Sequence, residues 1–175
     1  MRHFIRSRKG LSTVVTTLII LVVAVLLASV VTFYAINVVT TRVQEESLQI
    51  YKQHIWQNGT TFAEATFLLI NTGGRDVVLD KISVRGQESP WTNVYYNKTN
   101  TAISPDLYYL APNANGTLLG KTVTLSSRNY TLTQAKDDLI LRSGWSLIVY
   151  VTNPDSISVN DIGVTVGFAV FTANA

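Results

Sequence analysis

The fold of this chain is decided by residues 10–41, which read GLSTVVTTLIILVVAVLLASVVTFYAINVVTT. None of these 32 consecutive residues carries a charge. A helix of about 20 apolar residues is enough to span the hydrocarbon core of a bilayer. The stretch is therefore longer than membrane insertion alone requires, and the surplus indicates a helix that also packs against copies of itself.

The basic residues of the chain are concentrated immediately before this stretch. Arg2, Arg6, Arg8 and Lys9 precede it without an acidic neighbour, and the formal net charge of the whole chain is only +3. From Leu11 onward, Asp and Glu outnumber Lys and Arg by one. No basic patch remains beyond this leader, so we predict that the protein requires no nucleic acid.

Three interpretations of the first 40 residues compete. A cleaved secretory signal has an apolar region of 7–15 residues and a small-x-small cleavage site, and here the region is about twice that length with no Ala-x-Ala after it. A signal anchor explains the topology, because the basic leader stays in the cytoplasm and the residues after Arg42 are exported. The third interpretation also explains the sequence that precedes the apolar stretch.

The junction Arg8-Lys9-Gly10-Leu11-Ser12 resembles the cleavage site of archaeal class III signal peptides. In that family a prepilin peptidase cuts after the glycine, on the cytoplasmic side of the apolar segment, and the segment stays with the mature protein. The resemblance implies processing at Lys9, Gly10 and Leu11. Glycine suits such a site, because a residue without a side chain lets a protease approach the backbone closely.

The apolar stretch itself resembles the helical core segment of archaeal type IV pilins and archaellins. Val15 stands where bacterial type IV pilins carry a glutamate, which favours the archaeal branch. The resemblance implies a homo-oligomeric helical filament, with a prepilin peptidase, a platform protein and an assembly ATPase as partners. The precursor is then expected in the cell membrane and the mature subunit in an extracellular filament at the cell surface. The helix–helix assembly core is predicted at Leu18, Leu21, Val25, Leu26, Ala28 and Phe33.

We predict that the helix continues beyond the apolar stretch as far as Gln57. Val39, Val43, Tyr51 and Ile55 recur at three- and four-residue spacings and their multiples, which is an amphipathic helical pattern. Neither Pro nor Gly interrupts this region, and Asn58-Gly59 supplies a helix stop. The predicted domains are a leader over residues 1–10, a membrane-anchoring and filament-forming helix over residues 11–57, and an exported domain over residues 60–175.

From Thr61 onward the hydrophobic period changes to two, which predicts β-strands. Short strands separated by Gly, Asn and Pro turns, without helical crossovers, favour an antiparallel sandwich. The fold class is therefore α+β, a long N-terminal hydrophobic α-helix followed by an antiparallel β-sandwich that is similar to the immunoglobulin-like outer domain of archaeal filament proteins. Strands are predicted at residues 63–69, 76–84, 93–96, 107–110, 122–125, 139–141, 145–151 and 162–170.

Four Asn-x-Thr sequons follow the apolar helix, at Asn58, Asn97, Asn115 and Asn129. An exported domain is accessible to N-glycosylation, and an acceptor asparagine must be exposed. A chain rich in Asn and Thr also produces sequons by chance. We expect a glycoprotein in which at least two of the four sites are used.

The residues needed for catalysis or metal binding are scarce. The chain has no cysteine and two histidines, His3 and His54, so no nucleophile–base–acid set can be assembled. Asp155, Asn160 and Asp161 offer oxygen ligands, but their spacing matches no calcium loop. We expect no cofactor, no metal and no enzymatic activity.

These observations favour a structural protein, the subunit of an extracellular archaeal type IV pilus filament that serves adhesion. An archaellin of the rotating motility filament is the alternative within the same class. A monomeric, membrane-anchored extracellular binding domain is the alternative from a different class.

Overall fold

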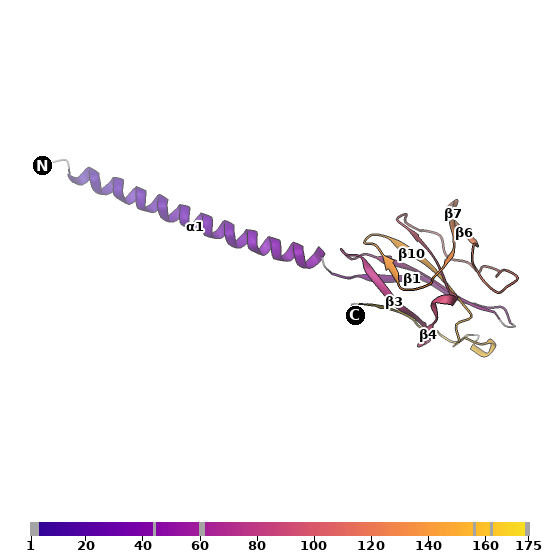
Figure 1. Ribbon diagram of the computed structural model, residues 1–175. Coiled ribbons are helices and arrows are strands. Elements are labelled where there is room, and N and C mark those ends of the chain that lie inside the picture. The colour runs from indigo at the N-terminus through magenta and orange to yellow at the C-terminus, as the bar shows by residue number, and fades with distance from the viewer. Residues whose placement is uncertain (1–3, 44, 60–61, 156, 162, 174–175) are drawn as a thin grey trace. The chain divides into compact units, whose positions relative to one another are not determined.

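The computed structural model describes residues 4–43, 45–59, 62–155, 157–161 and 163–173. Two compact units make up the chain, and the division between them falls after Val43. The first unit contains α1, a single helix over Phe4–Val43 (Figure 1). Its side chains are described from Ser12 to Thr41. The second unit is a β domain.

The β-branched residues that dominate α1 are poor helix formers in water. In apolar surroundings the backbone must satisfy its hydrogen bonds within the segment, and only a helix allows this for a single segment of chain. The helix accordingly ends at Val43, one residue after the first charge that follows the apolar run.

The predicted extension of the helix to Gln57 is wrong, because Leu48–Gln57 form strand β1. Beyond Thr41 no apolar run obliges the backbone to bond within itself, and residues such as Ile50 and Trp56 favour an extended backbone. Pairing with the next strand satisfies that backbone instead. The predicted domain over residues 11–57 is therefore an apolar helix plus the first strand of the β domain, which begins before residue 60.

The predicted helix stop at Asn58-Gly59 is likewise a turn between two strands. The Asn58 N–H donates to the Phe62 carbonyl over 3.1 Å. Gly59 has a φ of 79°, a conformation that glycine adopts without a steric penalty. The sequence signal for a left-handed glycine is correct, and its structural context is a hairpin.

Two packed sheets form the expected antiparallel sandwich (Figure 1). Sheet A has the strand order β1-β2-β10-β5-β8, and sheet B has the order β11-β3-β4 with β9 also paired to β3. The strands of sheet A are β1, β2 (Ala63–Asn71), β10 (Ser146–Thr152), β5 (Val94–Thr99) and β8 (Thr133–Gln134). The strands of sheet B are β11 (Phe168–Thr172), β3 (Val77–Val84), β4 (Gln87–Ser89) and β9 (Leu139–Leu141). A separate hairpin pairs β6 (Thr122–Leu125) with β7 (Arg128–Thr131), and short 3₁₀ turns lie at Trp91–Asn93 and Val159–Asp161.

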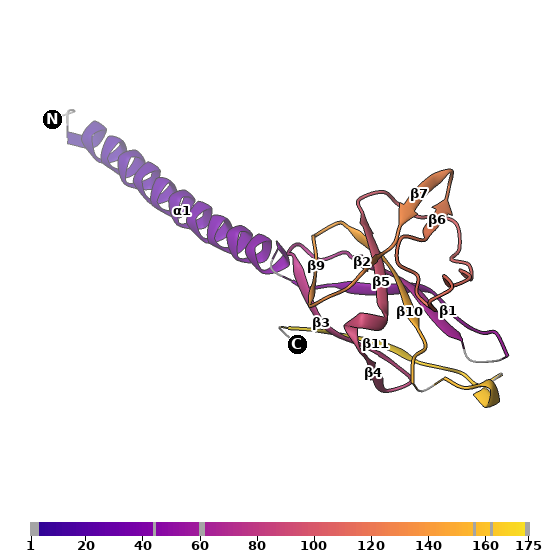
Figure 2. The same ribbon diagram turned by 45° about the vertical axis from the view of Figure 1, so that its right-hand side comes forward.

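The central strands of sheet A, β2 and β10, are buried on both of their faces. One face packs on sheet B through residues such as Phe67, Val149 and Leu79. The other face is covered by residues 100–121, here called the cover loop, and by the β6–β7 hairpin. Figure 2 shows β6 and β7 on one side of sheet A and β3, β4 and β11 on the other. The chain therefore closes two hydrophobic cores within the β domain.

Burial on both faces explains the sequences of the central strands. β2 contains Phe-Leu-Leu-Ile over residues 67–70, and β10 contains Leu-Ile-Val-Tyr-Val over residues 147–151. Near-continuous apolar runs are typical of strands covered on both sides, whereas one-sided strands alternate. The alternation that we inferred around residue 63 is therefore incomplete, since Glu64, Thr66 and Leu68 are buried as well.

Most predicted strands are present, with two differences. Residues 107–110 belong to the cover loop and contain no strand, although Leu107 and Leu110 are buried. The last strand, β11, starts at Phe168 and not at residue 162, a position outside the described residues. The pattern did not reveal β1 or the short strands β4, β7 and β8.

Candidate functional site

The surface of α1 is the main candidate functional site. Ser12–Thr41 is a stretch of 30 residues with a mean hydropathy of 3.1, and none of it is buried within the chain. Its large apolar side chains are between 42% and 70% exposed. The helix is long and apolar enough to cross a membrane, a property that membrane anchors share with signal sequences near an N-terminus.

The predicted assembly core lies on this exposed helix. All six side chains are exposed. With 100° of rotation per residue, Leu18, Leu21, Val25 and Ala28 follow one side of the helix. Apolar residues nevertheless surround α1 on all sides, so the helix presents an apolar cylinder and not a single seam.

Six hydroxyl groups of α1 are bonded back to the helix. Thr16 donates to the Ser12 carbonyl over 2.9 Å, and Ser29 donates to the Val25 carbonyl over 2.8 Å. The hydroxyls of Thr17, Thr32, Thr40 and Thr41 donate in the same way. A hydroxyl that bonds to its own helix needs no external partner, so these residues leave the surface apolar.

The predicted processing junction lies inside α1. The backbone at Lys9, Gly10 and Leu11 is helical. A cut after Gly10 would remove the first seven helical residues, Phe4 to Gly10, and would leave the apolar stretch from Ser12 to Thr41 intact.

The β domain places two of the four sequon asparagines in exposed positions suited to modification. Asn115 lies in a tight turn, in which the Gly116 N–H donates to the Asn113 carbonyl over 2.8 Å. Asn129 lies on β7, and its Oδ1 accepts a hydrogen bond from the Thr124 hydroxyl over 2.8 Å. That bond does not involve the amide nitrogen, the atom that carries a glycan, and the side chain is exposed.

The other two asparagines have different environments. Asn97 is half-buried in β5, and its Nδ2 donates to the Thr131 carbonyl over 2.7 Å. Asn58 is exposed at the β1–β2 turn, where its Oδ1 accepts from the Phe62 N–H over 3.2 Å. The structure thus separates Asn97, whose amide nitrogen is engaged, from the three exposed sites.

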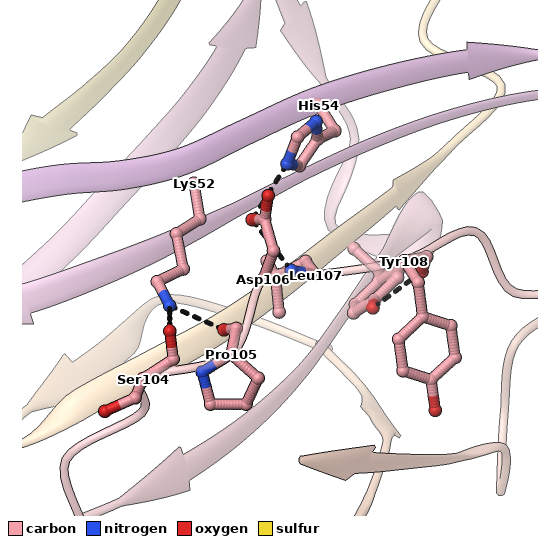
Figure 3. Close-up of polar contacts among 8 residues, drawn as sticks. Lys52, His54, Ser104, Pro105, Asp106, Leu107 and Tyr108 are labelled. Atoms are coloured by element: carbon pink, nitrogen blue, oxygen red, sulfur yellow. Dashed lines mark hydrogen bonds and ion pairs between the residues drawn. The ribbon is translucent and has the colours of Figure 1, made fainter. Parts of the chain in front are cut away.

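Polar groups hold the cover loop against sheet A. The Lys52 ammonium donates to the Ser104 and Pro105 carbonyls, and His54 Nε2 lies 2.9 Å from Asp106 Oδ1 (Figure 3). The hydrogen bond with His54 lowers the pKa of the Asp106 carboxyl. Sequence reasoning placed His54 on a helix and missed this cluster, because the strand period of residues 48–57 was read as helical.

Beneath the cover loop lies a buried carboxyl group, Glu64 of β2. Its Oε1 accepts a hydrogen bond from the Leu110 N–H over 3.0 Å, whereas Oε2 has no hydrogen-bond partner among the described residues. Burial raises the pKa of Glu64 to about 7 and also raises the pKa of its neighbour Tyr150, whose hydroxyl donates to the Tyr108 carbonyl over 3.0 Å.

Asp161 is bonded by Ser158 of its own loop and by Arg85 of the turn that follows β3. Asp161 Oδ2 accepts from both the N–H and the hydroxyl of Ser158 over 2.8 Å, and Oδ1 accepts from Arg85. These bonds lower the pKa of the Asp161 carboxyl to about 2, and the bond from the Ser158 hydroxyl has the largest effect. Across the described residues, no group of three or more His, Asp or Glu side chains is placed to hold a metal ion.

Comparisons with protein-family models, with curated proteins and with solved structures find no match to this chain. We therefore infer the function from the residues of the chain itself. What they establish is a helix able to cross a membrane and a β-sandwich that closes its cores without that helix.

We predict that the β domain loses stability as the pH rises from about 4.5 to about 7, the unfolded and folded pKa values of Glu64. Over that range the unfolded chain releases the proton and the folded chain retains it, so the stabilisation is complete below 4.5 and is lost by 7. The loss is about 3 kcal/mol at most. Urea unfolding of the full chain in detergent, followed by tryptophan fluorescence, measures it, because all three tryptophans lie in the β domain.

Glu64→Gln keeps the acceptor for Leu110 and should remove this part of the pH dependence. Glu88→Gln is the matched control, because it removes the same charge from an exposed position on β4. Equal pH profiles for Glu64→Gln and the unmodified chain would contradict the assignment.

We also predict that N-glycans are attached to Asn115 and Asn129 but not to Asn97, whose amide nitrogen already donates to Thr131. Peptide mass spectrometry of the exported protein measures the occupancy at each position. Asn115→Gln and Asn129→Gln should each remove one glycan mass, whereas Asn97→Gln should leave the mass of the attached glycans unchanged. A glycan found on Asn97 alone would reject the ranking.

Proposed function

We propose that this chain is the structural subunit of an extracellular archaeal filament of the type IV pilus class, which polymerises through α1. The observation that carries the proposal is the apolar surface of Ser12–Thr41, exposed on all sides within its own chain. Apolar area gains about 25 cal/mol per Å² when it leaves water. A helix of this kind must therefore be covered by lipid, by other chains, or by each in turn.

The length of the apolar stretch supports two successive environments. Thirty helical residues extend about 45 Å at 1.5 Å per residue, whereas the hydrocarbon core of a bilayer is about 30 Å thick. Lipid alone leaves about a third of this length unexplained. Packing among neighbouring helices in a filament covers all of it.

The residues before the apolar stretch support a change of environment after export. Arg2, Arg6, Arg8 and Lys9 hold the helix start at the cytoplasmic side of the membrane. A cut after Gly10 removes all four charges, so nothing then opposes the movement of the helix start out of the cytoplasmic interface. Each α1 exchanges lipid for neighbouring helices, and its apolar area stays out of water throughout.

Packing, and not the hydrophobic effect, drives helix association from lipid, because lipid tails are as apolar as the side chains. Small residues at Ala24, Ala28 and Ser29 allow close approach of neighbouring helices. The Ser29 hydroxyl is satisfied by Val25 within its own helix, so it brings no unpaired polar group to such a contact.

The β domain suits the outer surface of such a filament. Its two cores are made entirely of residues beyond the helix, so its folding does not depend on what surrounds α1. Adhesive contacts and glycans belong to its exposed surface. A prepilin peptidase, a platform protein and an assembly ATPase are the partners that this function requires.

Two alternatives use the same helix differently. An archaellin would assemble in the same way into a rotating filament, and motor genes beside its own would identify it. A monomeric membrane-anchored binding domain would keep α1 in lipid and its leader uncleaved. Electron microscopy of the exported material and N-terminal sequencing of the mature chain distinguish this last case from both filament proteins.

Gly10→Phe should block processing, because the side chain denies the peptidase close approach to the backbone. The expected result is an uncleaved membrane precursor that starts at Met1, whereas the unmodified mature chain starts at Leu11. Ser7→Phe adds the same bulk three residues upstream and should leave the cut in place. N-terminal sequencing measures both, and a mature start at Leu11 in Gly10→Phe would reject the proposed junction.

Leu21→Asp should abolish filaments, because a carboxylate in an all-apolar helix contact has no partner. Leu21→Met keeps the volume and polarity of the side chain and should assemble normally. Electron microscopy measures assembly, and tryptophan fluorescence confirms that the β domain is folded. The membrane fraction must contain the precursor of both variants. Intact filaments of Leu21→Asp would show that α1 is not the assembly core.

A further inference from the structure

The chain enters the β domain through Glu45–Ser47, here called the neck, which follows α1 and Gln44. A turn between β2 and β3, residues Asn71–Gly74, holds it and is here called the anchor turn. The N–H groups of Thr72 and Gly73 both donate to the Ser47 carbonyl, over 2.8 and 3.1 Å. The Gly74 N–H donates to the Glu45 carbonyl over 3.2 Å. Three consecutive N–H groups of the turn thus bind the neck backbone.

The approach of the two backbones requires glycine at position 73. A Cβ atom there would lie 2.6 Å from the Glu45 carbonyl oxygen and 2.7 Å from the Ser47 nitrogen. Both neighbours are backbone atoms, so they cannot move aside as the end of a flexible side chain can. The reason for Gly73 is therefore space for the neck and not a left-handed backbone conformation.

The anchor turn is fixed to both sheets by Asn71, which is fully buried at the end of β2. Its Nδ2 donates to the Leu141 carbonyl of β9 over 3.1 Å and to the Arg75 carbonyl over 2.8 Å. Its Oδ1 accepts from the Gly73 N–H over 3.0 Å. Sheet A and sheet B are thereby joined at the point where the neck is held.

Side chains add further contacts to the neck. Glu46 Oε1 lies 3.6 Å from Arg75 Nε, and Glu46 Oε2 accepts from the Thr172 hydroxyl over 3.4 Å. The Ser47 and Thr72 hydroxyl oxygens are 2.8 Å apart. The neck therefore contacts the anchor turn, Arg75 and β11, and these contacts do not involve β1.

The strand that follows the neck is poorly suited to resist a pull. β1 is the edge strand of sheet A and pairs with β2 alone. Its register shifts between Tyr51 and His54, and Lys52 has a φ of 54°. A bulge interrupts the ladder of hydrogen bonds, so a load that reached β1 directly would open the sheet from this edge.

We propose that the anchor turn is the mechanical attachment of the neck to the β domain, and that it resists a pull applied through α1. It transfers a pull from α1 to the central strand β2 and to sheet B, so that β1 is bypassed. The inference rests on the proposed function only for the source of the load, because a helix held in a filament or in a membrane pulls on the same three neck residues.

Single-molecule pulling of the full chain in detergent tests this attachment. One handle is attached at a cysteine introduced by Thr41→Cys, which is unique because the chain has no cysteine, and the other at a C-terminal tag. In the unmodified chain the neck should stay attached, so that the β domain unfolds in a single step. Gly73→Ala should add an early event at a lower force, in which residues 45–57, ~45 Å of extended chain, are released.

Gly167→Ala is the matched control, because a Cβ atom at this glycine meets no heavy atom within 4 Å and its backbone is not left-handed. It should unfold as the unmodified chain does. If Gly73→Ala does not fold, the exposed pair Ser47→Ala with Thr72→Val replaces it and should lower the force of the first event.

Identical first events in the unmodified chain and in the neck variants would overturn the proposal. If the first events are identical and electron microscopy nevertheless shows filaments, the proposed attachment is rejected and the proposed filament function is kept. If the chain never forms filaments but Gly73→Ala shows the early event, the proposed filament function is rejected and the proposed attachment is kept.

Discussion

A 30-residue helix with apolar side chains on all sides is unfavourable in contact with water, and the rest of this structure is arranged around that constraint. Six hydroxyl groups of α1 donate to carbonyls of the same helix, so these residues add no unpaired polar group to the surface that the helix offers to lipid or protein neighbours. The two cores of the β domain contain no described residue of α1, and the membrane and a filament are the two environments that we propose for the helix.

Independence from α1 requires the β domain to supply its own burial, and it does so by covering both faces of sheet A. The cover loop is the unusual part of this arrangement, since it packs on sheet A without strands and is held by Lys52, His54 and the buried Glu64. Loops seldom bury their backbone because its polar groups need partners. Here the side chains of β1 and β2 provide several of those partners.

The apolar run and the antiparallel sandwich could be predicted from the sequence, because each depends on a hydrophobic period visible within one segment. β1 could not, since residues 48–57 fit a helical period as well as an alternating one and the choice depends on pairing with β2. The burial of Glu64 could not be predicted either, because the cover loop that buries it is distant in sequence. The role of Asn71–Gly74 was likewise hidden, since it lies in contacts with residues 45–47 and 141.

The bulge in β1 also limits how neighbouring domains can meet. An open sheet edge is a template for strands of other chains, and interruptions and lysines at the edge are common protections against such pairing. Domains tethered at close spacing along one axis would experience a very high local concentration of identical edges. In the filament that we propose, an irregular edge would keep each β domain a separate body, so that the helices alone would hold the subunits together and the outer surface would stay free to vary.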